Sequence, residues 1–303
     1  MPTRRHFLAA SATLAAGLAL NGLPLAQASS AILTRKIPST GEALPVIGAG
    51  TSGSFEVEAG SPEYQQLKQV LKVFFNGGGR VIDTSPNYGG ADAILGQLLE
   101  EGGWRDKTFI ATKIAADSRA AAEAQWAESL QKLRTDKVDL LQIHNLRNWQ
   151  HQLPYARELK DRGLTRYVGV THYIDNGLDE LEHILRSEAL DFIQIHYSVN
   201  STNAARTVLP LAQDKGVAVL INRAFDDGRL FARVKGQALP GWATEAGIGS
   251  WAQLFLKFAI SHPAVTTVIP ATSRPDRQLD QLKAGSGPLL TSAQQQDLIK
   301  QFA

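Results

Sequence analysis

The sequence predicts an α/β fold, namely a (β/α)8 TIM barrel with an N-terminal β-hairpin. Short apolar runs typical of buried strands alternate with stretches of helical periodicity, which is the pattern of a parallel sheet. Eight such units follow one another without a break in composition, which favours a closed barrel over an open sheet. The length of 303 residues also accommodates one barrel, which needs roughly 250.

The first elements have clear local reasons. Apolar stretches at 32–37 and 43–47 flank a turn that contains Pro38 and Gly41, which predicts a hairpin. The helix expected over 63–76 has its apolar residues on one face and ends at three consecutive glycines. The remaining units in the first half are strands at 45–50, 80–84, 108–113 and 138–144, with helices at 91–100 and 120–133.

The second half repeats the pattern. Gly163 and Gly216 each follow an expected helix and mark its end. Strands are expected at 167–170, 191–195, 217–221 and 265–269. Helices are expected at 153–162, 177–187, 204–215, 250–261 and 275–284, and a terminal helix at 291–302 has Ser292 as a candidate cap.

The first 28 residues differ from the rest. Arg4 and Arg5 precede an Ala/Leu-rich run over 7–20, which is shorter than the roughly 20 residues of a membrane span. Ala26-Gln27-Ala28 places small residues where a signal peptidase reads. We therefore expect a twin-arginine signal peptide over 1–28, removed after Ala28, and a periplasmic barrel domain over 29–303. An unprocessed leader is the alternative interpretation.

Composition excludes several functions. The chain has no cysteine, so disulfides, thiol catalysis and thiolate metal sites are absent. It has 31 basic and 29 acidic residues, and the expected leader holds two arginines and no acid, so the mature chain is neutral. The sequence has no basic stripe interleaved with aromatic residues, so it gives no indication of nucleic-acid binding. The expected partners are a small-molecule substrate and the twin-arginine export machinery, with no stable membrane insertion after cleavage.

Four polar residues coincide with the ends of consecutive strands. Asp83, Lys113 and His144 end the second, third and fourth strands, and Tyr88 follows Asp83 in a loop marked by Pro86, Gly89 and Gly90. Each has a structural alternative, such as a surface lysine or a hydrogen-bonded core histidine. In a barrel, however, the active site lies at these strand ends. Their convergence at one rim therefore favours a catalytic site.

These side chains suit proton donation to a carbonyl oxygen. The phenol of Tyr88 is a weak acid, and a nearby Lys113 ammonium would lower its pKa. Asp83 would keep Lys113 charged, and His144 would hydrogen-bond the substrate oxygen. Reduction also needs a hydride, which no side chain supplies, so a nicotinamide cofactor is implied.

The strand phrases and this spacing resemble the aldo-keto reductase family over about 32–284. The matching phrases include Arg80-Val-Ile-Asp-Thr-Ser-Pro-Asn-Tyr-Gly, Thr112-Lys113, Val138-Asp-Leu-Leu-Gln-Ile-His144 and Arg166-Tyr-Val-Gly-Val170. The resemblance implies a TIM barrel, NADP as the favoured cofactor with NAD as the alternative, and Tyr88 as proton donor. The product of such a reduction is an alcohol.

The resemblance also implies cofactor positions, some of which differ from the family pattern. Thr171-His172 stands where Ser-Asn is usual, Asn222 stands where a tyrosine commonly stacks on the nicotinamide, and Gln281 stands near the usual adenine-binding asparagine. Arg277 fits the arginine that meets a 2′-phosphate. The full expected set is Thr171, His172, Gln194, Asn222, Thr272, Ser273, Arg274, Arg277 and Gln281.

Two other functions remain open at this stage. The exported barrel could bind a cofactor or small ligand without reduction, because Asn222 replaces an aromatic. His144, His172, His196 and Asp83 could instead ligate a metal in a hydrolase. Substrate identity should lie in the loops over 52–60, 146–153 and 226–248, where Phe55, Trp149, His151 and Trp242 are candidate pocket residues.

Overall fold

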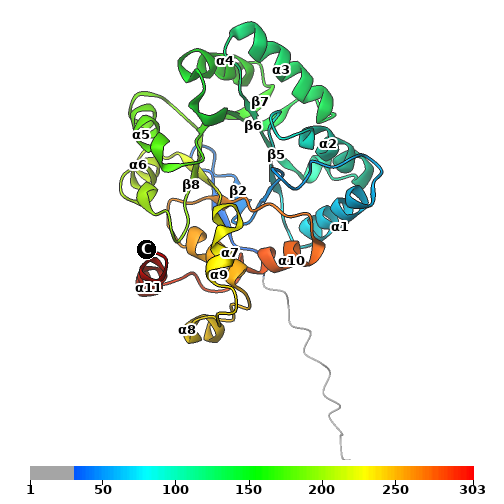
Figure 1. Cartoon of the computed structure of the whole chain (residues 1–303). Helices are drawn as coiled ribbons and strands as arrows, with labels where there is room; N and C mark the ends of the chain where they lie inside the picture. The colour runs from blue at the N-terminus through cyan, green and yellow to red at the C-terminus, as the bar shows by residue number, and fades with distance from the viewer. Residues whose placement is uncertain (1–30) are drawn as a thin grey trace, which may run out of the picture. The chain divides into compact units, whose positions relative to one another are not determined.

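The computed structural model describes residues 31–303, so the expected signal peptide lies outside the described residues. Eight parallel strands form a sheet in sequential order from β3 to β10, and helices surround it (Figure 1). The predicted (β/α)8 barrel is confirmed. The strands are β3 (Ala49–Gly50), β4 (Val81–Asp83), β5 (Phe109–Ile114), β6 (Val138–Ile143), β7 (Thr165–Thr171), β8 (Phe192–His196), β9 (Ala218–Asn222) and β10 (Thr267–Val268).

The helices follow the expected alternation, with several differences in the second half. Helix α6 begins at Val208 after a separate turn, and Thr291, not the expected Ser292, caps the terminal helix. Helix α4 begins at Trp149, upstream of the expected start at Leu153, and it contains Pro154. The stretch expected to be irregular holds two short helices, α7 (Arg229–Arg233) and α8 (Gly241–Glu245). The others are α1 (Pro62–Asn76), α2 (Ala91–Gly102), α3 (Arg119–Lys132), α4 (Trp149–Asp161), α5 (Leu178–Ser187), α6 (Val208–Asp214), α9 (Trp251–Ile260), α10 (Pro275–Lys283) and α11 (Ser292–Phe302).

The barrel closes between its first and last strands through a short seam. Gly48 N donates to Val268 O over 2.8 Å, and Gly50 N donates to Pro270 O over 2.9 Å. A Cβ on Gly48 or Gly50 would lie 2.9 Å from a neighbouring carbonyl oxygen, so the close approach requires glycine. Gly48, Gly50 and Gly53 have the spacing of a dinucleotide-binding GxGxxG motif. A turn and not a helix follows them, so here Gly48 and Gly50 serve barrel closure and Gly53 lies in the turn.

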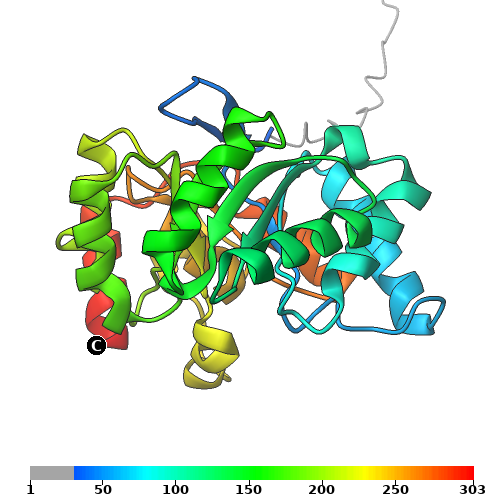
Figure 2. The ribbon, with the colours of Figure 1, turned by 90° about the horizontal axis from the view of Figure 1, so that it is seen from above.

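The N-terminal hairpin closes one end of the barrel. Strands β1 (Thr34–Lys36) and β2 (Ala43–Pro45) pair antiparallel, as predicted. Ile37 and Leu44 from the hairpin belong to the same buried cluster as inward-facing residues of the strands, including the contacting rings of Phe109, Tyr167 and Phe192. Figure 2 shows the hairpin in blue at one end of the barrel and the yellow helical segment that follows β9 at the opposite end. The opposite end is therefore the one left for a site.

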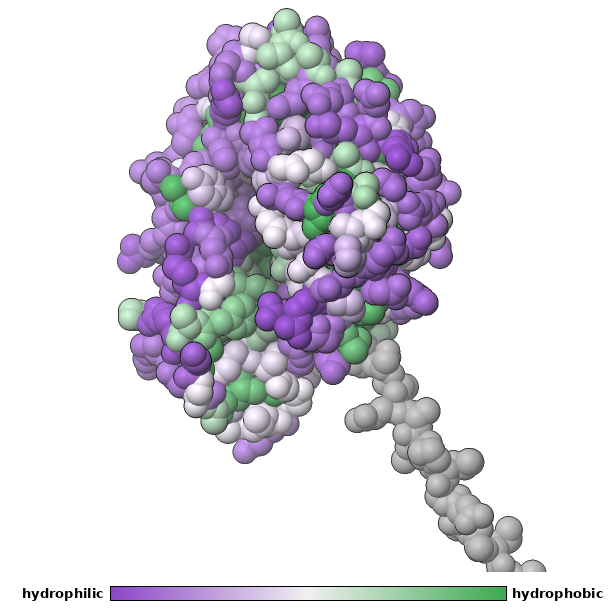
Figure 3. All heavy atoms as spheres, turned by 45° about the vertical axis from the view of Figure 1, so that its right-hand side comes forward, coloured by the Kyte–Doolittle hydropathy of each residue, from purple (hydrophilic) through white to green (hydrophobic). Residues whose placement is uncertain are grey.

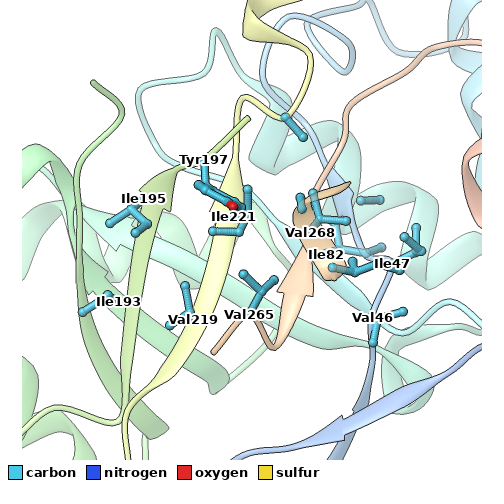
Figure 4. Close-up of a cluster of buried hydrophobic side chains, with 14 of the residues drawn as sticks. Val46, Ile47, Ile82, Ile193, Ile195, Tyr197, Val219, Ile221, Val265 and Val268 are labelled. Carbon is cyan, nitrogen blue, oxygen red and sulfur yellow. The ribbon is translucent and has the colours of Figure 1, made fainter. Parts of the chain in front are cut away.

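Strand alternation decides which side chains face the inside. Ile193 and Ile195 of β8, and Val219 and Ile221 of β9, point outward into the layer under the helices (Figure 4). The residues between them, such as Gln194, consequently face the barrel interior. The same rule turns Asp83, Lys113 and Asn222 inward at the carboxyl ends of their strands. In residues 31–303 no helix combines the length and apolar character needed to cross a membrane.

Candidate active site

A buried ion pair forms the floor of the site. Lys113 Nζ lies 2.6 Å from Asp83 Oδ2 and donates to Thr84 O over 2.8 Å. Asp83 Oδ1 accepts from Gln194 Nε2 at 2.7 Å and from Gln142 Nε2 at 3.2 Å. Both charged side chains are almost fully buried, and a buried charge is tolerated when it is paired and hydrogen-bonded. The expected counter-ion of Lys113 is therefore present.

Tyr88 and His144 lie beside this pair. The Tyr88 ring centroid is 5.1 Å from Lys113 Nζ and 5.7 Å from the His144 ring, which it meets edge-on at 83°. His144 Nδ1 lies 3.1 Å from Ser85 Oγ. This contact fixes the ring and leaves Nε2 as the nitrogen available to a ligand. All four residues expected at the rim are brought together.

The pKa of Tyr88 is shifted in the opposite direction from the one expected from the sequence. Burial raises the pKa of the Tyr88 phenol above its usual value, and Asp83 adds to the rise. The Lys113 charge lowers that pKa, as expected, but does not overcome burial. Tyr88 thus keeps its proton at neutral pH, which is the state that a proton donor needs.

Lys113 and His144 are also displaced from their usual pKa values. Burial alone would lower the pKa of Lys113, but the Asp83 charge outweighs burial and raises it, so the ammonium is retained. Burial, with help from the Lys113 charge, lowers the pKa of His144 to about 3. The imidazole is neutral over the physiological range, and it can therefore donate or accept a hydrogen bond without carrying charge.

These residues open into a cavity of about 740 Å³ at the carboxyl ends of the strands. Figure 3 shows one face of the molecule, hollowed near its centre with hydrophobic side chains below the hollow. Of the residues expected at the site, Asp83, Tyr88, His144, Thr171, Gln194, Asn222 and Arg277 line the cavity. Lys113 lies beneath the floor, and His172, Thr272, Ser273, Arg274 and Gln281 are not among the lining residues.

The wall nearest Asn222 contains residues that the sequence reasoning did not assign. Tyr173, Arg223, Phe225 and Phe231 line the cavity, whereas Phe55, Trp149, His151 and Trp242 do not. Phe55 is buried in the core, and Trp149 Nε1 donates to Glu180 over 2.6 Å. Tyr173 lies two residues beyond Thr171, where β7 ends, and this position was the available signal.

The loop after β10 separates two arginines that the sequence treated alike. Arg274 makes a two-point contact with Asp276, through Nε at 3.0 Å and Nη2 at 2.6 Å. Arg277 is exposed and lines the cavity. Gln281 is buried, and its Oε1 has no partner among the described residues. Arg277 is thus the better placed of the two arginines for an anionic ligand.

The structure gives no support to the metal alternative. Within residues 31–303, no group of three or more His, Asp or Glu side chains is placed to hold a metal ion. His172 Nδ1 lies 2.9 Å from Ile174 O, and His196 Nε2 lies 2.9 Å from Ser198 Oγ. These histidines have partners within the protein.

Fold and site together define a barrel protein with a tyrosine, a lysine, an aspartate and a histidine converging at one end of the strands. The profile of the aldo/keto reductase family matches residues 46–301, and the chain belongs to this family. The aldo-keto reductase YhdN of Bacillus subtilis is 27% identical over 217 residues, which cover 65% of this chain and 63% of that protein. The chain thus matches less than two thirds of this relative's length.

Two further comparisons agree with this family assignment. Methylglyoxal reductase DkgB of Yersinia pestis is 29% identical over 229 residues, covering 68% of this chain and 80% of that protein. An aldo/keto reductase from Klebsiella pneumoniae, solved with NADP and acetate, superposes with a TM-score of 0.71 at 25% identity. That alignment covers 86% of this chain and 93% of the other.

We expect His144 to make the fold sensitive to acid. Its pKa is about 3 when folded and about 6.5 when unfolded, so below pH 6.5 the unfolded chain binds a proton that the folded chain does not. The free energy of unfolding should therefore fall as the pH is lowered, with His144 contributing about 2 kcal/mol between pH 6.5 and 5. Urea titrations at pH 7 and pH 5 measure the difference.

The variant His144→Asn should lose less stability between these two pH values than the wild type does. His151→Asn is the matched control, because His151 is exposed on α4 and should leave the pH dependence unchanged. An identical pH dependence in His144→Asn and wild type would contradict the buried, neutral state of His144.

Proposed function

We propose that this protein is an NADPH-dependent oxidoreductase that reduces an aldehyde or ketone to an alcohol. The observation that carries the proposal is the convergence of Tyr88, Lys113 and His144 on one cavity, with Asp83 as the buried counter-ion. Membership of the aldo/keto reductase family supports it. The carbonyl substrates named for the Yersinia relative agree with this class.

The protein's own residues donate the proton that the carbonyl oxygen needs. A carbonyl oxygen in the cavity accepts a hydrogen bond from His144 Nε2 and one from Tyr88 Oη. The hydride for the carbonyl carbon would come from NADPH, which would be oxidised to NADP. As negative charge develops on the oxygen, Tyr88 transfers its proton there. The nearby Lys113 ammonium stabilises the phenolate that remains, and solvent then restores the proton.

The cavity residues fit a nicotinamide cofactor. Asn222 Oδ1 is buried and has no partner among the described residues, so an acceptor is available for a carboxamide N–H. Thr171, Gln194 and Asn222 line this part of the cavity together. Arg277 lies on its border and offers a cation to a 2′-phosphate. The NADP bound by the Klebsiella neighbour supports NADP over NAD.

One observation favours a second candidate, a barrel that binds cofactor without turnover. Asn222 lies where the family commonly has a stacking aromatic, so the nicotinamide would lose that contact. This alternative predicts NADPH binding with no consumption of NADPH in the presence of any carbonyl compound. The same two measurements, binding and turnover, therefore separate the candidates.

We propose further that residues 1–28 are a twin-arginine signal peptide and that 29–303 function as the periplasmic barrel. Support comes from Arg4 and Arg5, the short apolar run, and Ala26-Gln27-Ala28. This signal type implies export of a folded protein, which would allow the cofactor to be loaded before export.

Tyr88→Phe should abolish most turnover and keep cofactor binding. Loss of a general acid typically costs about 10²- to 10⁴-fold in rate. The measurement is NADPH oxidation with small aldehydes, alongside NADPH titration by fluorescence. Tyr155→Phe is the control, because Tyr155 lies on the buried face of α4, outside the cavity. Unchanged turnover in Tyr88→Phe would rule out its proton-donor role.

Arg277→Leu should weaken NADPH binding and spare NADH. A charge-assisted contact with a phosphate contributes about 1.5 to 3 kcal/mol, or roughly 10- to 100-fold in affinity. Arg274→Leu is the matched control, since Asp276 already occupies that guanidinium. Dissociation constants for both cofactors decide the question, and equal effects on NADPH and NADH would oppose the 2′-phosphate role.

Export should produce a mature protein that begins at Ser29. N-terminal sequencing of periplasmic material tests the cleavage position, and a chain starting at Met1 would reject it. Replacing Arg4 and Arg5 together by lysine should retain the precursor in the cytoplasm, because the route reads the arginine pair. Export of the double variant at the wild-type level would contradict the twin-arginine assignment.

A further inference from the structure

The loop after β9 carries an arginine that the proton-transfer site does not use. Arg223 follows Asn222 directly and lines the same cavity as Tyr88 and His144. Its backbone is left-handed, with φ of 52°, and Asp226 and Asp227 in the same loop have φ of 49° and 53°. Non-glycine residues rarely adopt this conformation, and clusters of them mark functional loops. The loop thus holds Arg223 at the cavity wall against its backbone preference.

The guanidinium of Arg223 is confined but incompletely bonded. Its Nη2 lies 2.7 Å from Asp227 Oδ2 and 3.4 Å from Asp226 Oδ1. Its Nε is buried and has no hydrogen-bond partner within the described part of the chain. The ring of Tyr173 lies 5.5 Å from the guanidinium carbon, and only 15% of the side chain is exposed. Arg223 Nη1 also has no hydrogen-bond partner in residues 31–303 but is not enclosed, so Nη1 is the donor that an acceptor in the cavity can reach.

Asp226 and Asp227 do not use all the hydrogen-bonding capacity of the Arg223 guanidinium. Asp226 is already held by Arg229 and by Asn200, whose Nδ2 donates over 2.9 Å. Asp227 is 57% exposed, so solvent weakens its pairing with Arg223. A ligand anion can therefore add to Arg223 without leaving a buried carboxylate unpaired.

The guanidinium of Arg223 faces away from the loop after β10. Its central carbon is 5.5 Å from the ring centroid of Tyr173. Tyr173, its stacking partner, comes from the loop after β7. Arg277 and the loop expected to hold the cofactor phosphates follow β10, on the other side of β9. A group bound at Arg223 is consequently separated from that phosphate loop.

We infer that Arg223 selects carbonyl substrates that carry a carboxylate, which it binds through its unfilled guanidinium donors while the carbonyl faces Tyr88 and His144. This inference rests on the proposed reductase function and names its substrate class. Carboxylates pair with arginine through directed hydrogen bonds, and a neutral group of the same shape gains little from the cation.

The test compares acids with their methyl esters at two lengths: 4-oxobutanoate with methyl 4-oxobutanoate, and 4-carboxybenzaldehyde with methyl 4-formylbenzoate. The wild type should prefer at least one acid over its ester in kcat/KM. Arg223→Met should lower kcat/KM for that acid by about 10- to 100-fold and change that for the ester by less than about threefold. Lys235→Met, which removes an exposed cation just after α7 and outside the cavity, should keep the wild-type preference.

A second variant guards against misfolding of the first. Asp227→Asn removes the competing carboxylate and keeps the arginine, so the preference for the acid should rise. A wild type that prefers both esters, or an Arg223→Met variant that changes acid and ester equally, would overturn the inference. So would an Asp227→Asn variant with an unchanged preference.

Binding without turnover distinguishes this inference from the proposed function. In calorimetric titrations of the NADP-loaded protein, at least one of the two acids should bind wild type at least about tenfold more tightly than Arg223→Met. If it does so while no carbonyl compound is reduced, the reductase function fails and the carboxylate site stands. If Arg223→Met instead weakens NADPH itself by tenfold and leaves the acid-to-ester ratio unchanged, Arg223 binds the cofactor phosphates and the inference fails.

Discussion

The buried ion pair between Lys113 and Asp83 is the constraint on which the rest of the site depends. Neither charge can lie inside the barrel alone, and breaking such a pair typically costs about 3 to 5 kcal/mol. Gln142 and Gln194 complete the bonding of the carboxylate, so β4, β5, β6 and β8 must all keep their register at this level. A one-residue slip of any of them would turn its polar side chain outward into the apolar layer under the helices. The pair therefore fixes the geometry of the barrel end as well as its charge.

The Lys113 charge affects the pKa values of two neighbours, Tyr88 and His144, to different extents. Lys113 is close enough to oppose the effect of burial on Tyr88 without overcoming it, and it reinforces the effect of burial on His144. The result is a protonated phenol beside a neutral imidazole, with a permanent cation below the phenol ring. The three states are mutually consistent, because the cation disfavours a second positive charge on His144 and favours a phenolate only after the proton has left. One buried ammonium thus sets the protonation of the whole site.

Residues with one dominant role could be predicted from sequence, and residues with competing interactions could not. Asp83, Lys113 and His144 end apolar runs, so strand periodicity alone placed them at one rim. The direction of the Tyr88 pKa depended on the balance between burial and a neighbouring charge, and the sequence contains only the charge. Helix α4 begins at Trp149 because the chain turns through left-handed residues at Asn145, Leu146 and Asn148, which no helix signal marks. Arg223 was not assigned to the cavity for a similar reason: its backbone is left-handed and its carbonyl accepts from Asp226 N over 2.7 Å, and no sequence signal marks this turn.

Under the proposed function, the loop after β9 recognises its ligands through the polar groups of Asn222 and Arg223. An aromatic at position 222 would instead offer a stacking face that does not distinguish a charged ligand from a neutral one. Asn222 instead offers an unpaired acceptor, and the Arg223 guanidinium offers unpaired donors. These groups favour only ligands that supply the complementary hydrogen-bonding group. Buried polar groups left unpaired penalise the wrong ligand more strongly than an apolar wall does. The proposed selection at the loop after β9 is linked to the ion pair through one amide. Asn222 Nδ2 donates to Gln194 Oε1 over 3.3 Å, and Gln194 Nε2 donates to Asp83 Oδ1 over 2.7 Å.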